Sequence, residues 1–364
     1  MVQIKIEDLQ EGCILTEDVF SLSNRPIISK NSVVTREIMN VLEAFLIKEV
    51  NVASTLVNGL PFTPPLNIRD ELAALEHIDD ENKNLFTLFL HAAQQYEKEF
   101  KSWQSGMPVE IQAIRNIMLP LIEKLDEATS ADVFSLYHLS TEEHYIYQHA
   151  VAVGTISAYI GKKLNMEKGK IIQLALGGCL SDCGMAKIKP SILNKKGSLT
   201  AEEFDEIKRH SIYSYKMIQN ISSLSDLTKT GIIQHHERLD GSGYPLGDRD
   251  QKVNEVARII AVADVFHAMT SQRQYRRKQS PFKVLELLLE DSFGKYDISA
   301  IQAVSAGMMN FSVGSKVKLS DGQVAHVLFN EEKSPTRPLV KLDDSGEIIH
   351  LERHRQIYIE EVLS

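Results

Sequence analysis

Histidines and aspartates recur at separate points along segments whose apolar residues have helical spacing. The set consists of His149, Asp182, His210, His235, His236 and Asp264. Imidazole and carboxylate groups are the ligands that borderline divalent metals take in proteins. His210 follows Ile207 by three residues and His149 precedes Ala150, so both lie on or beside apolar helix faces. Polar groups directed into a helical core need partners, and a shared metal cluster would satisfy several of them at once.

Any one of these residues, taken alone, is more simply explained as a hydrogen-bonded core histidine or a helix-capping aspartate. The run His235-His236-Glu237, followed by Gly241, Gly243, Tyr244 and Pro245, is far more specific. Adjacent histidines at the end of a helix can direct two imidazoles toward one cavity. The glycines allow the following loop to fold closely over that cavity.

The run HHERLDGSGYP resembles the HHExxxGxGYP signature of the HD-GYP branch of the HD phosphohydrolase superfamily. The resemblance continues in order and spacing from YIYQHAVAV to QRQYR and covers roughly Tyr145 to Met309. It implies an all-helical bundle that hydrolyses cyclic di-GMP to the linear dinucleotide, and in many members onward to GMP. It also implies two or three divalent metal ions, commonly iron or manganese.

The resemblance assigns a role to each residue of the set. It makes His149 the first ligand histidine, Asp182 the bridging carboxylate and Asp264 the final aspartate, and it gives His210, His235 and His236 to the second metal. Tyr145 stands where some members have a glutamate that recruits a third metal, so a two-metal site is expected. Tyr244, Arg273 and Arg276 resemble the substrate-binding residues, although two arginines there could also form a solvated helix end.

The chain departs from the family pattern at three positions. Ser181 precedes Asp182 where the family has the histidine of the His-Asp doublet. A hydroxyl binds a transition metal much more weakly than an imidazole, so we expect the first metal site to be weak or empty. Met185 replaces a lysine found in many members, and His267 replaces a second aspartate. His267 could add a ligand or be an exposed helix residue.

Three functions follow from this pattern. The first is a metal-dependent phosphodiesterase acting on cyclic di-GMP or a related cyclic dinucleotide, weak or conditional on metal supply because of Ser181. The second is a catalytically inactive cyclic di-GMP receptor or interaction protein. The third is a di-iron oxygenase, because related helical metal sites do redox chemistry. A homodimer or a signalling protein partner fits any of these readings.

The elements expected to position these residues are mainly helices. We predict a small α/β module over residues 1–60, a helical linker region over 61–130, an HD-type helical bundle over 131–311 and a small β-rich module over 312–364. Core stripes are expected at Leu85, Phe89, Ala93, Tyr96, Phe100 and Trp103. Helix starts are expected at Thr200, with Glu203 completing a capping box, and at Ser280-Pro281.

Composition limits the classes of partner and compartment. The net charge of −9 disfavours a broad phosphate-tracking surface, so long nucleic acid is not an expected partner. No apolar run is long enough to span a membrane, and the N-terminus lacks the layout of a secretory signal. Three cysteines, two of them in an apolar helical run, are expected to pack in the core. A cytoplasmic protein is the expectation.

Overall fold

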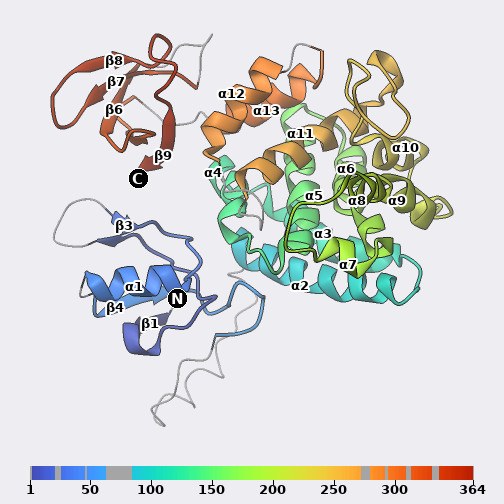
Figure 1. Cartoon of the computed structure of the whole chain (residues 1–364), viewed down its shortest axis with the longest axis horizontal. Helices are drawn as coiled ribbons and strands as arrows, with labels where there is room; N and C mark the ends of the chain where they lie inside the picture. Colours follow the sequence, from blue (N-terminus) through green and yellow to red (C-terminus); the bar gives the residue numbers. More distant parts are fainter. Residues whose placement is uncertain are drawn as a thin grey trace.

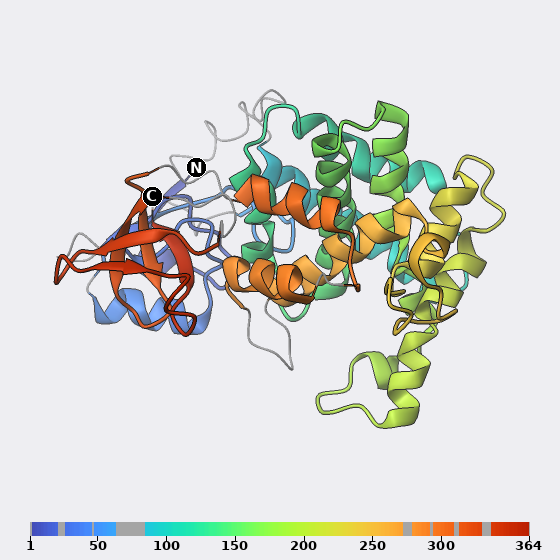
Figure 2. The same ribbon diagram turned by 90° about the horizontal axis from the view of Figure 1, so that it is seen from above.

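The computed structural model describes residues 2–20, 26–45, 47–62, 84–271, 279–291, 294–308, 313–329 and 336–363. It contains a helical bundle and two small terminal modules, which lie together on one side of the bundle (Figures 1 and 2). The predicted fold class, mainly α with a small α/β module first and a small β-module last, is confirmed. None of the described helices combines the length and apolarity that a bilayer span requires.

The N-terminal module consists of short antiparallel strands and one helix. Strand β1 (Val2–Lys5) pairs with β4 (Glu49–Val52), and β2 (Val19–Phe20) pairs with β3 (Pro26–Ile28). A short 3-10 helix η1 (Ile6–Asp8) follows β1, and α1 (Arg36–Ala44) begins after Thr35, whose side chain accepts the amide of Ile38. The module has its own apolar core, which includes Leu15, Leu42 and Val52.

The bundle opens with two helices that carry the predicted apolar stripes. Helix α2 (Leu85–Gln104) buries all six of the expected residues, and Tyr96 packs edge-on against Trp103 with 5.4 Å between ring centroids. Helices α2 and α3 (Ile111–Lys124) share one core with the later helices. These are α4 (Ser130–Phe134), α5 (Tyr145–Lys163), α6 (Lys168–Leu180), α7 (Pro190–Leu193), α8 (Ala201–Lys208), α9 (His210–Ile218), α10 (Asp226–Gln234), α11 (Glu255–Thr270), α12 (Pro281–Asp291) and α13 (Ile298–Met308), with short 3-10 helices η3 (Leu136–Leu139), η4 (Cys183–Lys187) and η5 (Asp250–Lys252) between them.

Local signals fix two of these helix starts. Thr200 and Glu203 form the predicted capping box, each side chain accepting the other residue's backbone N–H. Pro281 is the first residue of α12, as predicted. The hydroxyl of Ser280, however, donates to the carbonyl of Ile359 in the C-terminal module, at 2.7 Å. This serine therefore ties the helix start to a distant strand.

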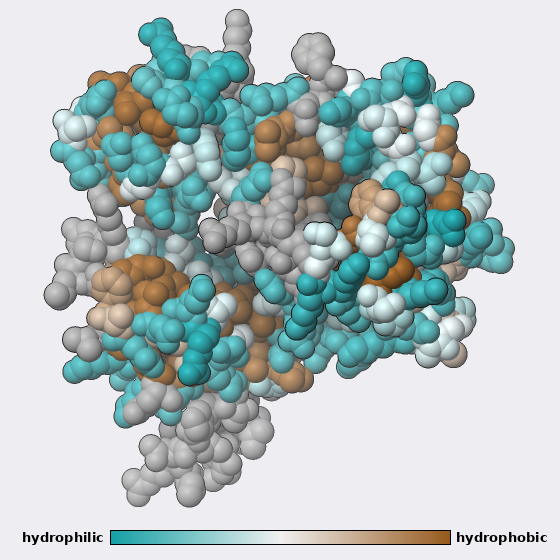
Figure 3. Space-filling model, in the orientation of Figure 1, coloured by the Kyte–Doolittle hydropathy of each residue, from teal (hydrophilic) through white to brown (hydrophobic). Residues whose placement is uncertain are grey.

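The C-terminal module is a five-stranded antiparallel sheet in the order β8-β7-β6-β5-β9. Its strands are β5 (Lys316–Leu319), β6 (Val324–Phe329), β7 (Leu339–Leu342), β8 (Ile348–His350) and β9 (Ile359–Leu363). Alternating residues such as Val317, Leu319, Val327 and Val340 are buried in a separate core. Hydrophilic side chains dominate the face seen in Figure 3, with apolar ones gathered over parts of both terminal modules.

Polar bonds join the modules to one another and to the bundle. Buried Arg337 donates its Nε to Glu286 of α12 at 2.6 Å and its other nitrogens to four backbone carbonyls of residues 351–357. Ser29 of the N-terminal module donates to Glu361 of β9 at 2.7 Å. The three parts are thus in direct contact, while the domain boundaries at residues 60, 130 and 311 stay a prediction.

Candidate metal centre

Five elements of the bundle bring the predicted ligands to one place. His149 comes from α5 and Asp264 from α11, while Asp182 lies in the turn between α6 and η4. The remaining ligands are His210, the first residue of α9, and the His235-His236 pair directly after α10. Residues up to 115 positions apart in the chain therefore face one another.

Asp182 lies between two groups of side chains. Its Oδ1 is 3.2 Å from His210 Nε2 and 3.4 Å from His235 Nε2. Its Oδ2 faces the other way, 3.6 Å from His149 Nε2. A carboxylate can bridge two cations with its two oxygens, whereas a neutral imidazole offers a single lone pair. We call His149, Asp182 and Asp264 the first group, and Asp182, His210, His235 and His236 the second group.

Tight packing holds the turn that carries Asp182 against α9. The hydroxyl of Ser214, one turn after His210, donates to the Ser181 carbonyl at 2.7 Å and accepts the amide of Gly184 at 2.8 Å. A side chain at position 184 would meet the His210 carbonyl at 2.1 Å. Glycine is therefore required there for Asp182 and His210 to approach one another.

The second group is compact, and its rings have fixed orientations. One ligand atom from each of its four residues lies within 4.8 Å of all the others. The Nδ1 atoms of His210 and His235 each donate to the carbonyl three residues earlier, Ile207 and Ile232, at 2.7 Å. Because a carbonyl only accepts, both rings carry their proton on Nδ1 when neutral and turn a bare Nε2 toward Asp182.

The donors of the second group fit a divalent metal ion. His210 Nε2 lies 3.3 Å from His235 Nε2 and 3.1 Å from His236 Nε2. Lone pairs at such separations repel one another unless a cation or a proton lies among them. The buried Oδ1 of Asp182 faces the same space without a hydrogen-bond partner. Imidazole nitrogen and carboxylate oxygen together are a ligand set for transition metals.

The electrostatics of the centre favour positive charge beside Asp182. Burial alone would raise the pKa of Asp182 and Asp264, but the neighbouring histidines outweigh it and hold both below their usual range. Burial opposes protonation of His210, yet Asp182 raises the pKa of that ring. Burial and the neighbouring His235 ring keep the pKa of His236 well below its usual value, so the His236 ring is neutral at pH 7.

The first group has fewer donors. His149 Nε2 lies 3.0 Å from Asp264 Oδ1, and Asp264 Oδ2 is 3.7 Å from His236 Nδ1. Ser181, in the position of the missing histidine, is buried and donates its hydroxyl to the Gly178 carbonyl at 2.8 Å. The hydroxyl is thus turned into its own helix end. Among the residues that the structure describes, His149, Asp182 and Asp264 offer the strong ligand atoms on this side.

Two other departures from the family pattern have clear positions. His267 is only 1% exposed, which rules out an exposed helix residue. It lies three residues after Asp264 on the inward face of α11, and its Nδ1 is 2.9 Å from His149 Nδ1. Met185 is partly buried and packs against the helical core. Tyr145 stacks on the His149 ring with 5.1 Å between centroids and 19° between planes.

The loop after the paired histidines folds back over the second group. Glu237 is buried, and its Oε1 accepts the amides of Leu246 and Gly247 at 2.6 and 3.1 Å. A Cβ at Gly243 would lie 2.4 Å from the Glu237 Cα and 2.5 Å from the His236 carbonyl. This role of Glu237 was not predicted from the sequence. The sequence feature that could have indicated it is an acidic residue directly before a glycine-rich loop, whose backbone amides need acceptors.

Tyr244 is the aromatic residue that this loop delivers to the centre. Its ring stacks on His236 with 4.7 Å between centroids and 29° between planes. Burial, together with Asp264 and Asp182, raises its pKa, so the phenol stays neutral. Arg273 and Arg276 lie outside the described residues. Cys179 and Cys183 are buried in the helical core, where packing was expected.

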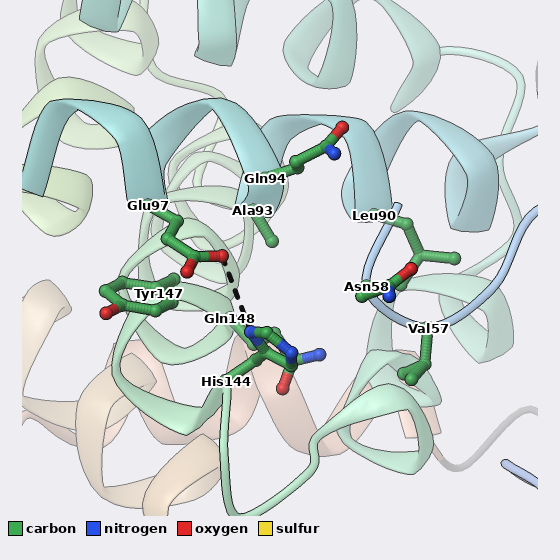
Figure 4. Close-up of a pocket in the computed structure, with 9 residues that line it drawn as sticks. All are labelled: Val57, Asn58, Leu90, Ala93, Gln94, Glu97, His144, Tyr147 and Gln148. Atoms are coloured by element: carbon green, nitrogen blue, oxygen red, sulfur yellow. Dashed lines mark ion pairs between the residues drawn. The ribbon is translucent and has the colours of Figure 1, made fainter. Parts of the chain in front are cut away.

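A small cavity lies at the start of α5, away from the histidine cluster. Figure 4 shows it between the loop at Val57 and Asn58, helix α2 and the first turn of α5. His144 forms an ion pair with Glu97 across it, with 3.4 Å between His144 Nδ1 and Glu97 Oε2. The cavity borders Gln148, the residue before His149. Residues of the N-terminal module and of α5 therefore line the same cavity.

The predicted ligands all lie in the part of the chain that matches the model of a protein family. Residues 137–299 match the model of the HD domain. A cyclic di-GMP phosphodiesterase of Pseudomonas aeruginosa is 28% identical over 283 residues, which cover 78% of this chain and 67% of that protein. A 3'3'-cGAMP-specific phosphodiesterase of Vibrio cholerae is 30% identical over 181 residues, 50% of this chain and 42% of that protein.

Among solved structures, the chain is similar to a HDG"Y"P protein from Bdellovibrio bacteriovorus. The likeness covers 83% of this chain and 97% of that chain, with 16% sequence identity and a TM-score of 0.48. The two structures are thus only loosely alike. The sequence matches are partial as well, since this chain spans about two thirds of the Pseudomonas protein and less than half of the Vibrio protein.

Proposed function

We propose that the chain is a metal-dependent phosphodiesterase of the HD-GYP type acting on a cyclic dinucleotide, on the premise of the HD-domain match over residues 137–299 and the Pseudomonas relative. One observation carries the proposal. Asp182 lies between two groups of ligand side chains and directs one oxygen to each. The relatives named as cyclic di-GMP and cGAMP phosphodiesterases support the substrate class.

The two groups would hold a metal ion with different sets of ligands. Iron or manganese in the second group would be held by three imidazoles and Asp182, and a second ion in the first group by His149, Asp182 and Asp264. A bound divalent ion supplies Lewis acidity at the phosphodiester and lowers the pKa of water. His236 and Tyr244 present stacked rings beside this position, and the neutral phenol can donate to a phosphate oxygen. Arg273 and Arg276 remain proposed phosphate contacts.

Hydrolysis is tested with protein purified without oxygen and loaded with iron(II) or manganese. Cyclic di-GMP and 3'3'-cGAMP are each incubated with it, and chromatography separates linear dinucleotide from mononucleotide. We expect linear product that disappears on chelation. Asp182→Asn serves as the inactive control. The absence of product from both substrates in fully loaded protein would contradict the proposal.

A receptor without turnover is the second candidate, and the orientation of Ser181 favours it. With the Ser181 hydroxyl bonded to its own helix end, the first group lacks a fourth strong donor. This candidate predicts cyclic di-GMP binding in calorimetry with no product. Ser181→His then discriminates between the two functions. A large rise in rate from near zero assigns the native chain to the receptor class, and no dinucleotide binding removes that class.

A further inference from the structure

The imidazoles of the two groups are held in different ways. In the second group, backbone carbonyls fix the His210 and His235 rings from within their own chain segments. In the first group, the Nδ1 of His149 meets the Nδ1 of His267, which is 118 residues away in the chain. A carbonyl dictates which nitrogen carries the proton, whereas a second imidazole can donate or accept. The state of His149 therefore depends on His267.

His267 is itself held by hydroxyl groups. Ser140 Oγ lies 3.3 Å from its Nε2, and Ser271 Oγ lies 3.3 Å from both ring nitrogens. Hydroxyls donate or accept as needed, so they satisfy either tautomer of the ring. Ser140 is fixed in turn by Gln148, which donates to the Leu139 carbonyl and accepts the Thr141 amide, both at 2.9 Å. All of these side chains except Thr141 are buried.

We propose that His267 is a positioning residue for the first group: it accepts a hydrogen bond from His149 Nδ1 and so keeps His149 Nε2 free to bind a metal. The proposal rests on the metal centre of the proposed function. The opposite arrangement, with His267 donating, would place the proton on His149 Nε2, where it would donate to Asp264 at 3.0 Å. That arrangement blocks the ligand atom. Because Ser181 is turned away, the first group depends on this one imidazole.

Two substitutions separate positioning from packing. In histidine and in aspartate, Nδ1 and Oδ1 are the same number of bonds from Cα, so His267→Asp can reproduce the contact with an atom that only accepts. His267→Leu fills a similar volume and cannot form the bond. Thr155→Val is the matched control, since Thr155 is buried on α5 and its hydroxyl bonds only to its own helix at the Val151 carbonyl among the contacts described.

Metal binding is the first measurement, by manganese titration of the metal-free chain of residues 1–364 with electron paramagnetic resonance of the free ion. We expect two binding steps in the native protein. His267→Leu should weaken the weaker step ~10–100-fold, the usual effect of losing a contact behind a ligand. His267→Asp should hold or strengthen that step, and the tighter step should stay unchanged in all variants. Thermal unfolding verifies that each variant folds.

Imidazole nitrogen NMR of the metal-free variants is the second measurement. His267→Asp should keep a proton on His149 Nδ1, and His267→Leu should leave that nitrogen bare with the proton on Nε2, facing Asp264. Equal weakening by both substitutions, the same protonation of His149 Nδ1 in both, or a native chain that never binds a second equivalent of manganese would each overturn the proposal. Metal affinity and tautomer are read without substrate, so a failure of dinucleotide hydrolysis leaves these results interpretable.

Discussion

The two groups that share Asp182 differ in how many imidazoles they contain and in what holds those rings. The second group has three imidazoles, two of them locked by carbonyls of their own segments, and a loop folded over it. The first group has one imidazole, held by a side chain from another helix, and a serine turned into its own helix end. Ligands locked by local backbone keep their geometry without help from distant residues. The second group should therefore hold its ion tightly while the first binds conditionally.

Removing the shared carboxylate should have the largest effect, because it belongs to both groups. Asp182→Asn keeps the shape but loses the charge that attracts cations. We expect metal affinity to fall at least ~100-fold in both groups, and hydrolysis to fall to background. Metal content after dialysis, measured by plasma mass spectrometry, checks this. Asp226→Asn, a change of a fully exposed carboxylate, is the control. Native metal content in Asp182→Asn would contradict the assignment of Asp182 to both groups.

Single histidine losses should be unequal if the groups differ as described. His236→Ala removes a proposed ligand of the second group, and we expect a loss of ~100-fold in the affinity of the tighter manganese step. His149→Ala should leave that step unchanged and abolish the weaker one. Calorimetric titration with manganese distinguishes the two steps. If both variants lower the same step by the same factor, the centre has one ion and the division into groups is wrong.

The closeness of the loop to the second group can be tested at Gly243. A methyl group there would collide with backbone atoms of His236 and Glu237, which cannot rotate away. Gly243→Ala should lower the free energy of unfolding by about 1–3 kcal/mol, measured in urea. It should also slow hydrolysis by displacing Tyr244. Gly197→Ala, where nothing lies within 4 Å, is the matched control. Equal stability of the two variants would argue against a tightly closed loop.

Lowering the pH should reveal the neutral state of His236 through the free energy of unfolding, with a smaller effect than the substitutions above. The folded pKa of His236 lies well below the unfolded value of about 6.5, so below that pH the unfolded chain binds a proton that the folded chain refuses. Stability should fall as the pH drops from 6.5 toward 5, by up to about 1.4 kcal/mol per unit. Urea unfolding of metal-free protein measures this. The dependence should be weaker in His236→Gln, and an identical slope would contradict a neutral His236.

Much of this architecture could be predicted from local patterns. The apolar spacing of α2 follows directly from the geometry of a helix with one buried face, as does the capping box at Thr200. The mainly helical fold with small terminal modules is visible in the change from helical to alternating periodicity near residue 312. The set of histidines and aspartates could be selected because charged or polar groups on apolar faces need a common partner.

The contacts behind the ligands could not be predicted in the same way. Whether His210 bonds its own backbone and His149 bonds another side chain depends on ring rotation and helix crossing, which sequence spacing does not encode. The burial of His267 was open to prediction, since a residue three positions after Asp264 shares its helix face. The role of Ser280 was not, because its partner Ile359 is 79 residues away.

The Arg337–Glu286 pair makes the last strands part of the bundle's folding unit. Arg337 is 3% exposed and its guanidinium is bonded at every nitrogen, so detaching the sheet would leave Glu286 of α12 with the partly exposed Lys283, 2.9 Å away, as its counterion among the described residues. Removing one partner of such a pair commonly costs about 3–5 kcal/mol. Damage at either residue would therefore reduce the cellular abundance of the protein while its chemistry stayed intact. Loss of function would then arise far from the metal centre, through turnover of unfolded chains.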